Sequence, residues 1–140
     1  MKQKKLQTII SLLSISTVLF FSGCFSTQKK NSTPESRWVN SMVYQVSVFT
    51  HCNKKIKNCN LIDLKKKSIR KAKFTAINDF NSQFKKKHKK AVFDLDSSVA
   101  LINKYGKLKE EKCNAQKGCE ILFEIKHPNL QNKVSNLRFK

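Results

Sequence analysis

Residues 69–84 read IRKAKFTAINDFNSQF and carry apolar side chains at helical spacing. At about 100° per residue, the apolar positions gather within roughly a quarter-turn of one helix face. They are Ile69, Ala76, Ile77, Phe80 and Phe84, with Ala72 at the border, while Arg70, Lys71, Asn78, Asn81 and Lys85 lie opposite. The spacing predicts one long amphipathic basic helix of about five turns, packed over residues 68–86, with Asp63 as its N-cap.

Strand patterns lie on both sides of this helix. Residues 38–50, WVNSMVYQVSVFT, alternate and predict one half-buried strand with Met42, Tyr44, Val46 and Val48 on a shared face. Residues 91–95 and 119–126 are also typical of strands. Residues 97–105 allow either a strand that turns at NKYG into 107–111, which we favour, or a short helix between Asp96 and Gly106. The segment CNAQKGC, residues 113–119, predicts a hairpin tip.

These elements predict an α+β fold, in which a small antiparallel sheet of about four strands packs against one long amphipathic basic helix. We expect three parts in the chain: a signal peptide over 1–23, a flexible tether over 24–36 and a single domain over 37–140. A domain of this size has a marginal hydrophobic core. It therefore benefits from covalent cross-links.

The first 24 residues, MKQKKLQTIISLLSISTVLFFSGC, are typical of an export signal. Lys2, Lys4 and Lys5 form a charged start, an apolar run follows, and small residues precede Cys24. The run is too short and too rich in hydroxyls for a membrane span of roughly 20 apolar residues. An incidental cysteine after a cleaved signal, or a short anchor helix, are the alternatives.

The end of this segment, Phe-Ser-Gly-Cys at residues 21–24, resembles the lipobox of bacterial lipoproteins. The resemblance covers residues 1–24 only, and Phe21 replaces the leucine usual in the family. It implies that Cys24 is lipidated and becomes the first mature residue. Phe25 stands where an aspartate retains family members in the inner membrane, so the resemblance implies the outer membrane of the bacterial envelope.

The chain has five cysteines, an odd number for an exported protein. Assigning Cys24 to lipid leaves an even set, and an oxidising compartment favours two disulfides among its members. These are Cys52, Cys59, Cys113 and Cys119. Three pairings are possible, and we favour the local one, Cys52 with Cys59 and Cys113 with Cys119. Zinc bound by these thiols and His51 is the alternative, although structural zinc sites space cysteines more closely.

The net charge is +20, and it is concentrated. Residues 54–90 hold fourteen Lys and Arg against Asp63 and Asp79, a net charge of +12. A basic surface of this density attracts anionic polymers or lipid headgroups. The candidate binding residues are Lys65, Lys66, Lys67, Arg70, Lys71, Lys85, Lys86, Lys87, Lys89 and Lys90. An A+T-rich coding sequence would also be rich in Lys, so part of the excess needs no partner.

Catalytic signals are weak. His51, His88 and His127 have no evident carboxylate or nucleophile beside them, and a phosphate loop or metalloprotease motif is missing. Asp94 and Asp96, two positions apart, would lie on one face of a strand, as a general acid and base could, but charge balance explains them as well. We expect no enzyme, no cofactor and no bound metal.

The sequence therefore predicts a lipid-anchored envelope protein that works by interaction. The expected partners are the membrane, through the N-terminal lipid, and a protein of an envelope or secretion assembly to which this chain is an accessory subunit. The alternative is a surface-exposed adhesin that binds anionic glycans, lipopolysaccharide or DNA through the basic helix. We expect no specific nucleic acid.

Overall fold

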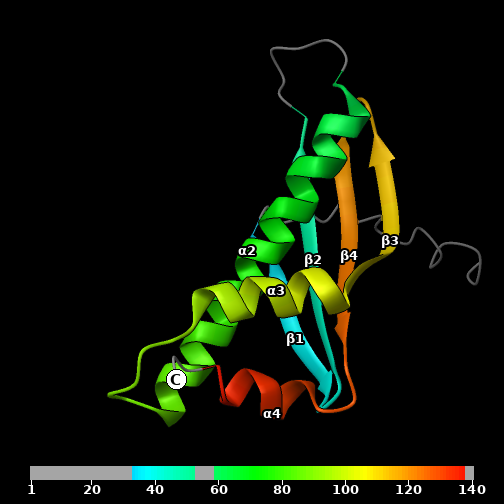
Figure 1. The fold of residues 1–140 in the computed structure, drawn as a ribbon. Coiled ribbons are helices and arrows are strands. Elements are labelled where there is room, and N and C mark those ends of the chain that lie inside the picture. The colour runs from blue at the N-terminus through cyan, green and yellow to red at the C-terminus, as the bar shows by residue number, and fades with distance from the viewer. Residues whose placement is uncertain (1–32, 53–58, 138–140) are drawn as a thin grey trace, which may run out of the picture.

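The computed structural model describes residues 33–52 and 59–137 as a four-stranded antiparallel sheet with helices, so the predicted α+β class is confirmed. The strands are β1 (Glu35–Asn40), β2 (Val43–His51), β3 (Gly106–Asn114) and β4 (Gly118–Lys126), and the helices are α2 (Leu61–Lys87), α3 (Leu95–Tyr105) and α4 (Leu130–Ser135). The strand order is β1-β2-β4-β3. Figure 1 shows α2 and α3 crossing one face of the sheet.

The predicted strand over 38–50 is two strands. The chain reverses at Ser41 and Met42, where the Asn40 side chain accepts a hydrogen bond from the Met42 backbone N–H at 2.9 Å and closes the turn. β1 then pairs antiparallel with β2, with Trp38 opposite Tyr44. β1 therefore begins inside the segment predicted as tether. The predicted signal peptide and Cys24 lie outside the described residues.

The core lies between the sheet and the helices. The predicted alternation of β2 is confirmed for Tyr44, Val46 and Val48, which are buried, whereas Met42 lies in the turn and is exposed. β4 runs antiparallel beside β2 and buries alternate residues on the same face. These are Cys119, Ile121, Phe123 and Ile125.

Helix α2 begins earlier than predicted because Asn60, not Asp63, is its N-cap. The Asn60 side chain accepts from the backbone N–H groups of Ile62 and Asp63 at 3.0 and 3.4 Å. The buried residues recur at every fourth position: Leu64, Ser68, Ala72, Ala76, Phe80 and Phe84. A step of four residues advances about 40° around a helix, so this buried row winds around α2 along its length.

The expected strands at 91–95 and 97–105 are wrong. Residues 91–94 are irregular apart from a single bridge at Phe93, and residues 95–105 form α3. Asp94 is the N-cap, and its carboxylate accepts from the Ser97 backbone N–H at 3.0 Å and from the Ser97 hydroxyl at 2.6 Å. These hydrogen bonds stabilise the helical alternative. Ser98, Leu101 and Ile102 then face inward at helical spacing.

Strand β3 follows α3 without a connecting loop. A Cβ at Gly106 would lie 2.4 Å from the Ile102 carbonyl oxygen and 2.5 Å from the Phe123 ring, so only glycine fits this junction. The predicted hairpin tip is confirmed, since β3 ends at Asn114 and β4 begins at Gly118. The last described element is α4, a helix in the tail for which the sequence showed no pattern. The described residues thus hold three helices rather than one.

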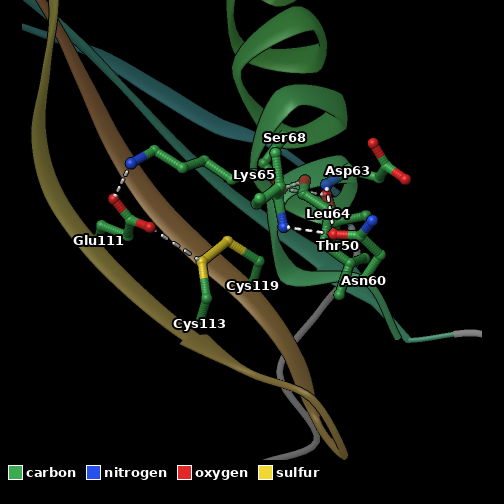
Figure 2. Close-up of a disulfide and its surroundings, with 10 residues drawn as sticks. Thr50, Asn60, Asp63, Leu64, Lys65, Ser68, Glu111, Cys113 and Cys119 are labelled. Atoms are coloured by element: carbon green, nitrogen blue, oxygen red, sulfur yellow. Dashed lines mark hydrogen bonds and ion pairs between the residues drawn. A yellow bond between two sulfur atoms is a disulfide. The ribbon is translucent and has the colours of Figure 1, made fainter. Parts of the chain in front are cut away.

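Both disulfides follow the predicted local pairing. Cys52–Cys59 links the end of β2 to the residue before the cap of α2, and Cys113–Cys119 joins opposite positions of β3 and β4. Figure 2 shows the second disulfide beside the first turns of α2. There the buried Ser68 hydroxyl lies 2.7 Å from the Thr50 hydroxyl and 2.9 Å from the Leu64 carbonyl oxygen, which ties α2 to β2.

The middle of α2 is held by Asp79. Its carboxylate accepts hydrogen bonds from the Tyr44 hydroxyl and, at 2.6 Å, from the Ser36 hydroxyl. Burial, and then the hydrogen bond to Asp79, raise the pKa of Tyr44. One turn further on, Trp38 Nε1 donates to Gln83 Oε1 at 3.0 Å. These contacts orient α2 and decide which side of it faces solvent.

Candidate anion-binding surface

The predicted cations fall into two groups along α2. The first is Lys65, Lys66, Lys67, Arg70 and Lys71, and the second is Lys85, Lys86, Lys87, Lys89 and Lys90. Arg70 and Lys85 are fifteen positions apart, which at 1.5 Å per residue is about 22 Å. The structure therefore separates the predicted basic region into two patches.

The first group is partly engaged by the protein itself. Lys65 Nζ lies 2.5 Å from Glu111 Oε2 on β3, so this lysine forms an ion pair (Figure 2). Lys71 is half-buried and has a partner of its own. Lys66, Lys67 and Arg70 are exposed. Three of the five predicted residues in this group thus remain available to an outside anion.

The second group is fully exposed and lies around the C-terminus of α2. Cations are favoured there because the helix dipole places partial negative charge at this end. His88, which lies among these lysines, is half-buried and structural. Its backbone N–H donates to the Phe84 carbonyl at 2.8 Å, and its Nε2 lies 2.9 Å from the Ser135 carbonyl oxygen on α4.

Few of the carboxylates that could neutralise these cations lie on α2. All nine acidic side chains of the chain are in described positions: Glu35, Asp63, Asp79, Asp94, Asp96, Glu110, Glu111, Glu120 and Glu124. Only Asp63 and Asp79 belong to α2, and Asp79 is held by Tyr44 and Ser36. Among the described residues, eight of the predicted cations form no ion pair: Lys66, Lys67, Arg70, Lys85, Lys86, Lys87, Lys89 and Lys90.

Between the two groups, α2 exposes an aromatic residue that the sequence analysis did not single out. Phe74 is 64% exposed. It lies midway between Ala72 and Ala76, and both of these are fully buried. Because two residues subtend about 200°, a helical projection centred on the alanines would have placed Phe74 on the opposite side.

The residues considered for catalysis are not brought together. The His51 ring packs on Phe49 and the His127 ring on Tyr105, with centroid distances of 4.7 and 4.5 Å. Desolvation, and then Lys133 and Lys104, lower the pKa of His127. Asp94 caps α3, and its hydrogen bonds with Ser97 lower its pKa. Asp94 and Asp96 therefore lie at a helix start and not on a strand face.

The cysteines considered as alternative zinc ligands are joined in disulfides. In the ranges 33–52 and 59–137, we find no cluster of three or more His, Cys, Asp or Glu able to hold a metal ion. In the same ranges, none of the helices combines the length and the apolar character needed to cross a bilayer. Comparisons of the chain with protein families, curated proteins and solved structures return no match.

Proposed function

We propose that this chain is an exported, lipid-anchored protein of the bacterial envelope whose domain binds an anionic partner through the exposed cations of α2 and of residues 88–90. The observation that carries the proposal is the set of eight exposed cations without a carboxylate partner. An acidic protein of an envelope assembly and an anionic polymer offer the same chemistry. Binding to a protein of an envelope assembly and binding to an anionic polymer, the two functions expected from the sequence, would therefore use the same surface.

The cysteine pairing supports the lipid anchor. Four of the five cysteines pair with one another, so Cys24 is the cysteine left over, and it stands where the lipobox places the acylated residue. An acyl chain contributes about 0.8 kcal/mol for each methylene that it buries in the membrane. Lipid on Cys24 would hold the domain close to the membrane surface.

The anchor is tested by Cys24→Ser in the full chain. We expect the wild-type protein in the membrane fraction with an acylated N-terminus, and the variant unacylated and released from the membrane. Fractionation followed by mass spectrometry of the N-terminal peptide measures both properties. The anchor is refuted if the wild-type chain is not acylated and the Cys24→Ser variant fractionates as the wild type does.

The binding surface is tested by replacing Lys85, Lys86, Lys87, Lys89 and Lys90 with Gln. Each cation near an anionic surface contributes about 1 kcal/mol, so we expect at least a roughly 100-fold weaker affinity for heparin at low salt. Wild-type binding should fall steeply as salt rises, because released counterions drive it, and the variant should lose most of that slope. Isothermal titration at several salt concentrations measures both quantities.

The sheet offers a matched control with the same change of charge. Replacing the five exposed lysines of β3, β4 and their turn with Gln should leave the affinity within about threefold, because carboxylates surround them. They are Lys107, Lys109, Lys112, Lys117 and Lys126. Equal losses in both variants would show that net charge alone drives binding and would refute a specific surface.

A further inference from the structure

We propose that one face of α2 docks on an anionic lipid bilayer, with the Phe74 side chain inserted among the lipids and the flanking cations on the headgroups. This inference deepens the proposed function and rests on it. It names the anionic partner as a membrane surface rather than a soluble polymer. We call this the outer face of α2; it consists of Lys67, Arg70, Phe74, Asn78 and Lys85.

The outer face is straight although the buried row is not. At 3.6 residues per turn, Lys67, Arg70, Asn78 and Lys85 all project within about 40° of Phe74. All five residues are exposed. Ala72 and Ala76 lie on the far side of the helix, against the core. A flat partner can therefore contact the whole outer face at once.

Phe74 distinguishes a bilayer from other anionic partners. An exposed phenylalanine in the middle of a helix contributes nothing to the core, and its apolar area gains free energy when it leaves water. A bilayer provides an apolar phase beneath a charged layer, whereas a sulfated or phosphorylated polymer does not. Helices that carry cations beside an exposed aromatic residue bind at this boundary.

The spacing of the cations fits such docking. Arg70 lies one turn before Phe74, and Lys67 and Lys85 lie about 10 and 16 Å from it along the helix axis. Neither these three cations nor Phe74 has an ion pair or ring contact in the described part of the chain. Their long stems allow the charged ends to reach headgroups while the aromatic ring lies deeper.

A shallow hollow that begins one turn beyond Phe74 along α2 adds polar groups at headgroup level. Asn78, Asn81, Ser82, Lys85 and Lys86 line it. Amide, hydroxyl and ammonium groups are donors that a lipid phosphate accepts from.

The test places a tryptophan reporter at position 74 of the full chain, as Phe74→Trp, in proteoliposomes. One set contains equal parts of phosphatidylglycerol and phosphatidylcholine, and the other contains phosphatidylcholine alone. The unmodified chain supplies the background from Trp38. Glu110→Trp is the control, because Glu110 is exposed on β3 opposite Leu122, on the sheet face away from α2.

We expect the reporter fluorescence of the Phe74→Trp chain to shift to the blue and to be quenched by brominated lipid chains in the phosphatidylglycerol vesicles. Both effects should disappear with phosphatidylcholine alone, at high salt, and when Lys67 and Arg70 are also replaced with Gln. The reporter of the Glu110→Trp chain should remain unquenched throughout. Quenching at position 110 instead of 74, or equal quenching in both kinds of vesicle, would overturn the proposal.

Heparin binding of the Phe74→Trp and Phe74→Ser chains separates this inference from the proposed function. If heparin affinity persists while the reporter at position 74 is unquenched in every vesicle, the anion-binding function stands and membrane docking is refuted. If heparin affinity falls as far with Phe74→Ser as with the five-lysine variant, the outer face binds a polymer and docking is again refuted. Both the anion-binding function and membrane docking are supported if two results are found together. The five-lysine variant loses heparin binding while the Phe74 variants keep it, and the reporter at position 74 is quenched.

Discussion

The outer face of α2 and the solvent side of the sheet are both exposed and both rich in lysine, yet their electrostatics differ. On the sheet, the register places Lys107 opposite Glu124 and Lys112 opposite Glu120. Lys109 Nζ also lies 2.9 Å from Glu124 Oε2. On α2, the cations of the outer face point to solvent, with the carboxylate of Asp79 turned toward β1 and β2.

This difference shows that a count of lysines does not identify a binding surface. Opposite charges across neighbouring strands attract one another and leave little field at long range. Cations that form no ion pair retain more of their attraction for an external anion. The position of the nine acidic residues, more than that of the basic ones, therefore marks α2 as the candidate surface.

The larger of two stability effects is expected between the two regions, at Tyr44, which is buried where α2 packs on the sheet. In Tyr44→Phe the Asp79 carboxylate loses one of its two hydrogen bonds and keeps the one from Ser36. A hydrogen bond to a partly buried charged group contributes about 1–2 kcal/mol. Urea unfolding at pH 7 should show the variant less stable by that amount, with the fold retained in circular dichroism.

The same pair of proteins tests whether Tyr44 is held protonated in the folded state. Because the pKa of Tyr44 is raised in the folded state, its contribution to stability is complete below the pKa of an exposed tyrosine, about 10. The contribution is lost as the pH rises above that value, when the unfolded chain ionises first. The stability difference between wild type and Tyr44→Phe should therefore narrow above about pH 10. A difference that stays constant would mean that the pKa of Tyr44 is the same in the folded and the unfolded chain.

The smaller effect is expected on the sheet, at Glu124. Glu124 accepts from Lys109 and, at 2.7 Å, from Gln45, and these hydrogen bonds lower its pKa. In Glu124→Gln we expect the free energy of unfolding to fall by less than about 1 kcal/mol at pH 7, because exposed ion pairs contribute little.

The difference in stability between the wild type and Glu124→Gln should also depend on pH. Since the folded pKa of Glu124 is lowered, its contribution is present above the ordinary pKa of about 4.3 and is lost as the pH falls further. Thermal unfolding between pH 7 and pH 3 should show the wild type and the variant converge. If the stabilities of the two proteins diverge at low pH, the Lys109–Glu124 pair does not stabilise the sheet. The contrast between paired lysines on the sheet and unpaired cations on α2 would then be weaker.

Local patterns predicted much of the fold. The alternation over Tyr44, Val46 and Val48 and the turn inside CNAQKGC depend on short-range geometry, which a sequence displays directly. The strand predicted at 97–105 failed because Val and Leu fit both periods over so few residues. The Asp94 side chain decided between them by capping a helix. The break between β1 and β2 was missed because strand-like residues continue on both sides of the turn.

The sequence by itself determined the α+β class, the excess of positive charge and its concentration before residue 91, and it favoured the local disulfides. These properties depend on composition and on neighbours along the chain. Only the tertiary structure decided that Lys65 pairs with Glu111, that Asp79 turns inward, and that Phe74 faces solvent. Such outcomes depend on which distant strands the register brings beside α2. The physical reason is that pairing and burial are properties of contacts in space.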